Sequence, residues 1–206
     1  MGTRRDTLGL AGAGLVLFAA RVGAVEDAVG RVVSSTGTVA AVRGAGIVGL
    51  APGDAIYPHD IVRTGPESRL LIIGSDGLRV VIGADTELAV HSYLVRGPSG
   101  GIEVVLGLLQ GIMRLIGGQS ALPRSIAVDT RTAVASVRST EWLIESTEQG
   151  TAVLSIEGQV TVVGLAGGSV VLGPGEGTDV PPGGPPKAAA TWGQARRQDA
   201  IARTTI

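Results

Sequence analysis

The residues best suited to chemistry lie in one short segment, Arg138-Ser139-Thr140-Glu141-Trp142, between two β-branched runs. As a binding site, Arg138 and Glu141 would hold an anionic ligand or a sugar against the Trp142 ring. As part of a strand, alternation would place Arg138, Thr140 and Trp142 on one face, with Trp142 capping a core. We favour the structural interpretation, in which Arg138 satisfies loop carbonyls and holds a corner.

A second candidate is the segment Gly97-Pro98-Ser99-Gly100-Gly101, which matches the Gly-x-Ser-x-Gly pattern of a serine nucleophile. That nucleophile requires a strand before it and a helix after it. Here the proline and glycines predict a flexible loop, and the run from Ile102 predicts a strand. We therefore expect a loop at this position and no catalytic serine. With no other convergent acid, base or nucleophile in the sequence, we expect no enzymatic activity.

Candidate metal ligands are sparse. The chain has two histidines, His59 and His91, and neither has partners at a spacing typical of a metal site. Four aspartates lie at predicted corners: Asp54, Asp60, Asp76 and Asp85. Calcium binding at such corners would require an acidic repeat, which the sequence lacks, so Asx turns explain these aspartates better. We expect no metal and no cofactor.

The composition favours an all-β fold. Of 206 residues, 44% are hydrophobic but only 2% aromatic, so aliphatic side chains must build the core. The 33 glycines and 10 prolines predict many turns rather than long helices. Cysteine is absent, which excludes disulfides, thiolate metal sites and a cysteine nucleophile.

The charge excludes a typical nucleic-acid-binding protein. Seventeen basic and 18 acidic residues give a net charge of −1. Basic residues do not cluster, and aromatic rings for stacking on bases are almost lacking. Nucleic acid is therefore not an expected partner.

Residues 1–24 are predicted to be an export signal of the Sec or twin-arginine type. Arg4 and Arg5 precede an apolar run over 8–20, and small residues at 22–24 would allow cleavage before Val25. The run is shorter than the roughly 20 residues that a membrane span needs. A disordered start or an uncleaved anchor remains the alternative, and an anchor would be the chain's only membrane contact. The signal predicts a bacterial protein that is periplasmic or secreted, with a net charge of −3 after cleavage (−1 minus the +2 carried by residues 1–24).

From Gly30 to Val180 the pattern is strand, turn, strand. Short β-branched runs alternate with glycine-rich corners such as Asp76-Gly77 and Glu157-Gly158. This spacing suits a sandwich, a barrel or a β-solenoid. Over 102–118 we expect two strands around a turn at 109–111, with a buried helix as the alternative.

The last 26 residues are predicted to lie outside this domain. The segment 181–186 reads Pro-Pro-Gly-Gly-Pro-Pro, which is typical of a linker. A short helix is expected from Gln194 to Arg203, because glutamine, alanine and arginine are good helix formers. We therefore divide the chain into a signal at 1–24, a β domain at 30–180, and a linker with a C-terminal tail at 181–206.

Several of these motifs occur in the order found in the FecR domain. The motif segments are Gly53-Asp54, 60–65, 68–71, Asp76-Gly77, 111–115, 132–142 and 157–160. Over about residues 30–180 the chain resembles that family, with Arg131 and Ser139 differing from the residues the motif favours. The residues assigned to the motif framework are Gly53, Asp54, Asp60, Thr64, Gly65, Asp76, Gly77, Thr132, Val137, Arg138, Thr140, Glu141, Trp142, Glu157 and Gly158.

The resemblance implies a solenoid-like β module of the periplasm or cell surface without enzymatic activity. Well-known members regulate extracytoplasmic-function sigma factors in response to siderophore receptors. Only seven residues precede the apolar run here, so we expect no sigma-binding domain. We therefore expect an exported FecR-domain module that binds an envelope protein or a surface polysaccharide. The alternative is an accessory component of FecR-type, iron-linked transmembrane signalling.

Overall fold

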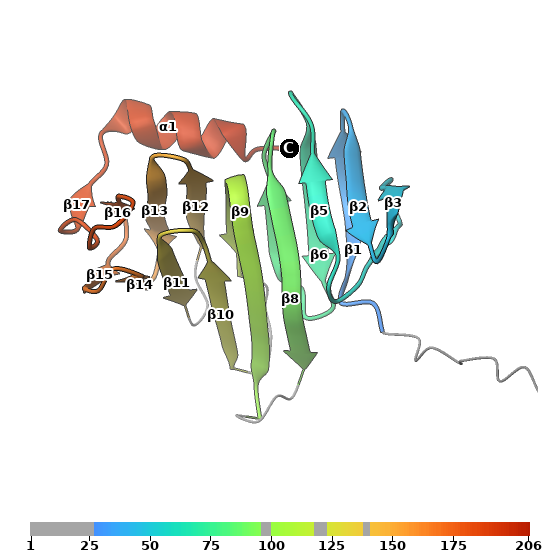
Figure 1. Ribbon diagram of the computed structural model, residues 1–206, viewed down its shortest axis with the longest axis horizontal. Helices are drawn as coiled ribbons and strands as arrows, with labels where there is room; N and C mark the ends of the chain where they lie inside the picture. Colours follow the sequence, from blue (N-terminus) through green and yellow to red (C-terminus); the bar gives the residue numbers. More distant parts are fainter. Residues whose placement is uncertain (1–26, 96–99, 118–122, 138–140) are drawn as a thin grey trace, which may run out of the picture.

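The computed structural model describes residues 27–95, 100–117, 123–137 and 141–206 (Figure 1). The expected export signal, most of the Gly-x-Ser-x-Gly loop, and the candidates Arg138 and Thr140 lie outside these residues. Most of the described chain is β-strand, with one short C-terminal helix, which confirms the all-β prediction.

The strands are short and follow one another closely. Their bounds are β1 Gly30–Thr36, β2 Val39–Arg43, β3 Gly46–Gly49, β4 Ala55–Ile56, β5 Ile61–Thr64, β6 Arg69–Gly74, β7 Arg79–Ile82, β8 Glu87–Val95, β9 Ile102–Ile116, β10 Arg124–Asp129, β11 Ala133–Val137, β12 Glu141–Thr147, β13 Gly150–Glu157, β14 Val160–Gly164, β15 Ser169–Leu172, β16 Glu176–Val180 and β17 Ala190–Thr191. The helix α1 spans Gln194–Arg203, as the sequence predicted.

The strands form two layers that share β9. One layer, sheet A, runs in the order β4-β1-β6-β7-β9-β12-β13-β16-β17. The other, sheet B, runs β3-β2-β5-β8-β9-β10-β11-β14-β15. Among these pairings only β9–β10 is parallel. The strands define a two-layered β arrangement. The solenoid-like form expected from the sequence stays a prediction.

Strand β9 corrects the expected turn at 109–111. It is one strand of 15 residues, whose first part pairs with β8 and β10 in sheet B and whose last part pairs with β7 and β12 in sheet A. The change of sheet occurs at Gly111, which has a φ of 95°. Glycine adopts this conformation without strain, so the strand bends there instead of reversing.

The main core lies between the two layers. It is built from aliphatic residues and from Trp142, which is fully buried. A second, smaller cluster lies on the outer face of sheet A, where Ile112, Leu143 and Leu154 meet Trp192 and Ala200. The helix α1 therefore crosses this outer face, as Figure 1 shows, and β17 pairs with β16 at its edge.

Candidate functional site

Asp76, from the predicted Asp-Gly turn, is the centre of a buried polar cluster. Its Oδ1 accepts the Leu78 backbone N–H at 3.0 Å, as in an Asx turn, and also accepts the Tyr93 hydroxyl. Its Oδ2 accepts Arg124 Nε at 2.5 Å, and Arg124 also donates to the Asp76 carbonyl at 3.1 Å. Burial, together with the hydrogen bond to Asp76, raises the pKa of Tyr93 far above its ordinary value. These contacts join the β6–β7 turn to β8 and β10.

Asp60 is also fully buried and paired. Arg43 binds it in a bidentate arrangement, with Nε on Oδ1 and Nη2 on Oδ2, each at 2.8 Å. The Asp60 carboxylate also accepts the Tyr57 backbone N–H, and the Arg43 guanidinium lies 4.4 Å from the Tyr57 ring centre. The hydrogen bond to Asp60 raises the pKa of Arg43, against the effect of its burial. Such an arrangement holds the corner before β5 and leaves no free carboxylate oxygen for a ligand.

The motif threonines Thr64 and Thr132 bond to backbone groups, and Thr132 also bonds to Thr151. Thr64 donates to the Gly83 carbonyl at 2.6 Å and accepts the Thr86 N–H at 3.0 Å. Thr132 donates to Thr151 Oγ1 at 2.7 Å and lies 3.1 Å from the Val180 carbonyl. Buried hydroxyls with these partners position the strand ends rather than act as nucleophiles.

The remaining glycine and aspartate motif residues lie at turns. Gly53, Gly77 and Gly158 have positive φ angles, and the Gly65 carbonyl accepts the Asp85 N–H. Asp54 accepts the Ala51 N–H at 2.7 Å, in an exposed turn. The Glu157-Gly158 pair forms the β13–β14 turn.

Three further motif residues, Val137, Glu141 and Trp142, lie in the strands that flank 138–140. Val137 is buried in the core opposite Val160, and Glu141 accepts hydrogen bonds from Arg114 across β9 and β12. Trp142 is in the core, and its Nε1 has no hydrogen-bond partner among the described residues. Glu141 and Trp142 therefore do not converge on a common ligand-binding surface: one pairs with a strand neighbour and the other faces the core.

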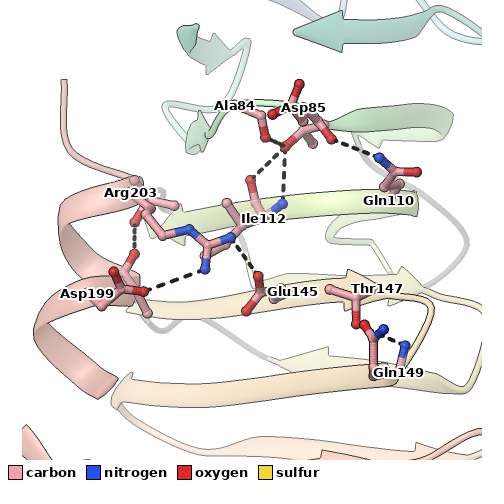
Figure 2. Close-up of polar contacts among 12 residues, drawn as sticks. Ala84, Asp85, Gln110, Ile112, Glu145, Thr147, Gln149, Asp199 and Arg203 are labelled. Atoms are coloured by element: carbon pink, nitrogen blue, oxygen red, sulfur yellow. Dashed lines mark hydrogen bonds and ion pairs between the residues drawn. The ribbon is translucent and has the colours of Figure 1, made fainter. Parts of the chain in front are cut away.

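A recess lies elsewhere, at the rim of the molecule beside the C-terminal end of α1. This rim groove has a volume of about 460 Å³ and is lined by Arg69, Ala84, Asp85, Gln110, Gly111, Arg131, Glu145, Ser146, Thr147, Glu148, Gln149 and Arg203. Figure 2 shows Arg203 beside Glu145 and Asp199, and Asp85 beside Gln110 of β9. A second groove of about 290 Å³ shares Glu145, Thr147 and Gln149 with it and continues towards Arg196.

The charges in the rim groove are of both signs. Arg203 donates to Glu145 at 2.6 Å and lies 3.6 Å from Asp199. The hydrogen bond to Glu145 raises the pKa of Arg203, although burial opposes this. Asp85, Gly111, Arg131 and Arg203 were noted from the sequence, but none of them as part of a groove. The lining comes from six separate stretches of the chain, so no local sequence signal would have joined them.

Metal binding finds no support in these contacts. Within the ranges that the structure describes, no three histidine, aspartate or glutamate side chains form a group able to hold a metal ion. His59 lies in a corner with a φ of 65°, and His91 is exposed on β8. In the same part of the chain, no helix is long and apolar enough to cross a membrane.

The fold is similar to that of two solved structures. Two crystal structures of a candidate anti-sigma factor from Parabacteroides distasonis ATCC 8503, at 2.50 and 1.65 Å resolution, match with a TM-score of 0.55 each and 14% and 16% identity. The match covers 68% of this chain and 63% and 64% of theirs, so the chain spans less than two thirds of these relatives. At this identity the likeness is one of fold. No curated protein matches the sequence.

The family model described as FecR protein matches residues 60–161. This range begins at the buried Asp60 and ends in β14. It includes Asp76, Thr132 and Trp142, whose contacts are described above. The chain therefore contains a FecR domain, which confirms the resemblance seen in its sequence motifs.

Proposed function

We propose that this protein is a non-enzymatic, exported FecR-domain module that binds another component of the bacterial envelope. The observation that carries the proposal is the FecR domain at 60–161, whose described polar motif side chains bond to the protein's own turns and strands. Asp60, Asp76 and Thr132 are each committed to internal partners. A domain built in this way offers its surfaces, rather than a reactive centre, to other molecules.

A second candidate function is an accessory role in FecR-type transmembrane signalling, linked to iron and sigma-factor regulation. The specific observation in its favour is that both similar solved structures are described as candidate anti-sigma factors. In that role the bound component would be a protein of the signalling pathway. The two candidates share the binding of a partner and differ in what the partner is.

The test is cross-linking of a tagged full chain in its native cells, followed by mass spectrometry of proteins captured from the envelope fraction. A tagged chain that starts at Val25 is the matched control, because it lacks the predicted signal. Capture of wall, surface-layer or polysaccharide-associated proteins supports the first function. Capture of a sigma regulator or an outer-membrane receptor supports the second. Recovery from the cytosol with residues 1–24 intact would overturn both, and N-terminal sequencing of the captured chain reports cleavage before Val25.

A further inference from the structure

The rim groove contains charged side chains that the fold does not pair. Arg69 and Arg131 line it, and neither forms an ion pair with any residue that the structure describes. Asp85 and Glu148 line the same groove and likewise form no ion pair within the described ranges. By contrast, the Arg203–Glu145 pair in this groove is satisfied internally. Two cationic and two anionic groups therefore remain available to a ligand.

Hydrogen-bonding groups accompany these charges. Gln110 and Gln149 are exposed in the groove, and each carries an amide that both donates and accepts. The Gln110 amide lies 3.4 Å from the Asp85 carbonyl, a long contact that a ligand could replace. Side-chain amides of this kind match the N–H and C=O groups of an extended peptide backbone.

The lining argues against other ligand classes. It contains no aromatic side chain on which a sugar ring or a base would stack. A polyanionic polysaccharide would meet the unpaired carboxylates of Asp85 and Glu148 as well as the arginines. An apolar ligand would leave all four charges desolvated and unpaired.

The shape of the recess favours an extended ligand. The rim groove of about 460 Å³ has the volume of a small-ligand site, and the second groove of about 290 Å³ continues it along the β12–β13 turn. Gln149 lies at the junction of the two grooves. A chain laid along this path would contact both recesses in succession.

We propose that the rim groove binds an extended peptide segment of a partner protein that carries both acidic and basic side chains. The acidic side chains pair with Arg69 and Arg131, and the basic ones with Asp85 and Glu148. The glutamine amides bind the peptide backbone between them. This inference rests on the proposed function, because it names the chemistry of the bound component.

The test is selection from a random dodecapeptide phage library on the purified protein. Three variants accompany the wild type: Arg69→Ala/Arg131→Ala, Glu148→Lys, and the control Arg79→Ala. Arg79 is exposed on the same sheet but lies outside the groove. Enriched peptides are then synthesised, and their affinities are measured by fluorescence anisotropy. Unfolding midpoints in urea establish that all the variants are folded.

We expect the enriched peptides to contain acidic and basic residues together. The double variant Arg69→Ala/Arg131→Ala should bind them about a hundredfold more weakly, about tenfold for each arginine removed, whereas Arg79→Ala leaves binding unchanged. Selection on Glu148→Lys should yield peptides with more acidic and fewer basic residues, a shift that a purely structural role would not produce. The proposal is overturned by no enrichment, by enrichment of apolar or single-sign peptides, or by equal binding to Arg69→Ala/Arg131→Ala.

The same double variant separates this proposal from the function on which it rests. When it is expressed in the native cells, capture of the envelope partner should fall. Undiminished capture would leave the proposed function intact and reject the groove as its site. Failure of the wild type to capture any envelope component would instead reject the proposed function.

Discussion

The carboxylate of Asp76 lies 2.5 Å from Nε of Arg124, although 48 positions separate the two residues. Both side chains are only 2% exposed. Asp76 lies in the turn between β6 and β7 of sheet A, and Arg124 begins β10 of sheet B. The pair therefore ties the two layers together at one end of the molecule.

Replacement of Asp76 by Asn should be strongly destabilising. The substitution removes the carboxylate charge that faces the buried Arg124 guanidinium, at a cost of about 3–5 kcal/mol in the free energy of unfolding. Urea unfolding followed by circular dichroism measures this loss. The control is Asp54→Asn, at an exposed turn, for which we expect about 1 kcal/mol or less. If the pair acts as one unit, Asp76→Asn/Arg124→Met will lose less than the sum of the two single variants.

The free energy of unfolding should fall above pH 10 because of Tyr93. Its pKa is raised in the folded state from an ordinary value of 10.0, so folding favours the neutral phenol. This contribution is complete below pH 10 and is lost progressively as the pH rises above 10. Urea unfolding between about pH 10 and 11.5 should show a decline about 1.4 kcal/mol per pH unit steeper for the wild type than for Tyr93→Phe. Equal slopes in the two proteins would contradict this role for Tyr93.

Gly111 and Gly53 provide a matched pair for testing the bend in β9. Both have a positive φ, 95° at Gly111 and 99° at Gly53. A Cβ added at Gly111 would lie 2.2 Å from Thr86 Oγ1. A Cβ added at Gly53 would have no heavy atom within 4 Å apart from those of its chain neighbours. Gly53→Ala should cost about 1 kcal/mol for the backbone conformation alone. Gly111→Ala should cost about 3 kcal/mol or more, because overpacking adds to that strain. Thermal and urea unfolding measure both, and equal costs would show that the contact with Thr86 is unimportant.

Trp192 should anchor the C-terminal segment to the outer face of sheet A. It is 7% exposed and packs in the cluster that contains Leu143, Leu154 and Ala200. Its replacement by Ala should cost about 3 kcal/mol and make α1 more sensitive to limited proteolysis. Ile206→Ala is the control, since a side chain that is 49% exposed should change stability by no more than about 0.5 kcal/mol. A Trp192→Ala protein with wild-type stability and protease resistance would contradict the anchoring role.

Local features were predictable from the sequence because their physical causes are local. The Asp76-Gly77 turn follows from an Asx hydrogen bond and a positive φ at Gly77, both within one turn. The helix at Gln194–Arg203 follows from a run of good helix formers after Gly193. The all-β fold follows from β-branched runs separated by glycine.

Features that depend on distant residues could not be read in this way. Gly111 in a β-rich run is equally compatible with a turn and with a bend, and only the pairing of β9 with strands of both sheets selects the bend. The pairing of Asp76 with Arg124 could likewise not be predicted, because no residue near Asp76 in the sequence specifies a partner 48 positions away. The rim groove is the extreme case, since its unpaired charges come from different turns and strands.

The sequence by itself thus determined most of the strand and turn pattern, the C-terminal helix and the FecR motif, but not the bend in β9. The tertiary structure decided which corners meet, which carboxylates are neutralised by arginines and which charges remain open to a partner. The physical reason is the range of the interactions. Turn chemistry and strand propensity act over a few residues. Ion pairing between distant residues, and the passage of β9 from one sheet to the other, depend instead on how the two layers pack.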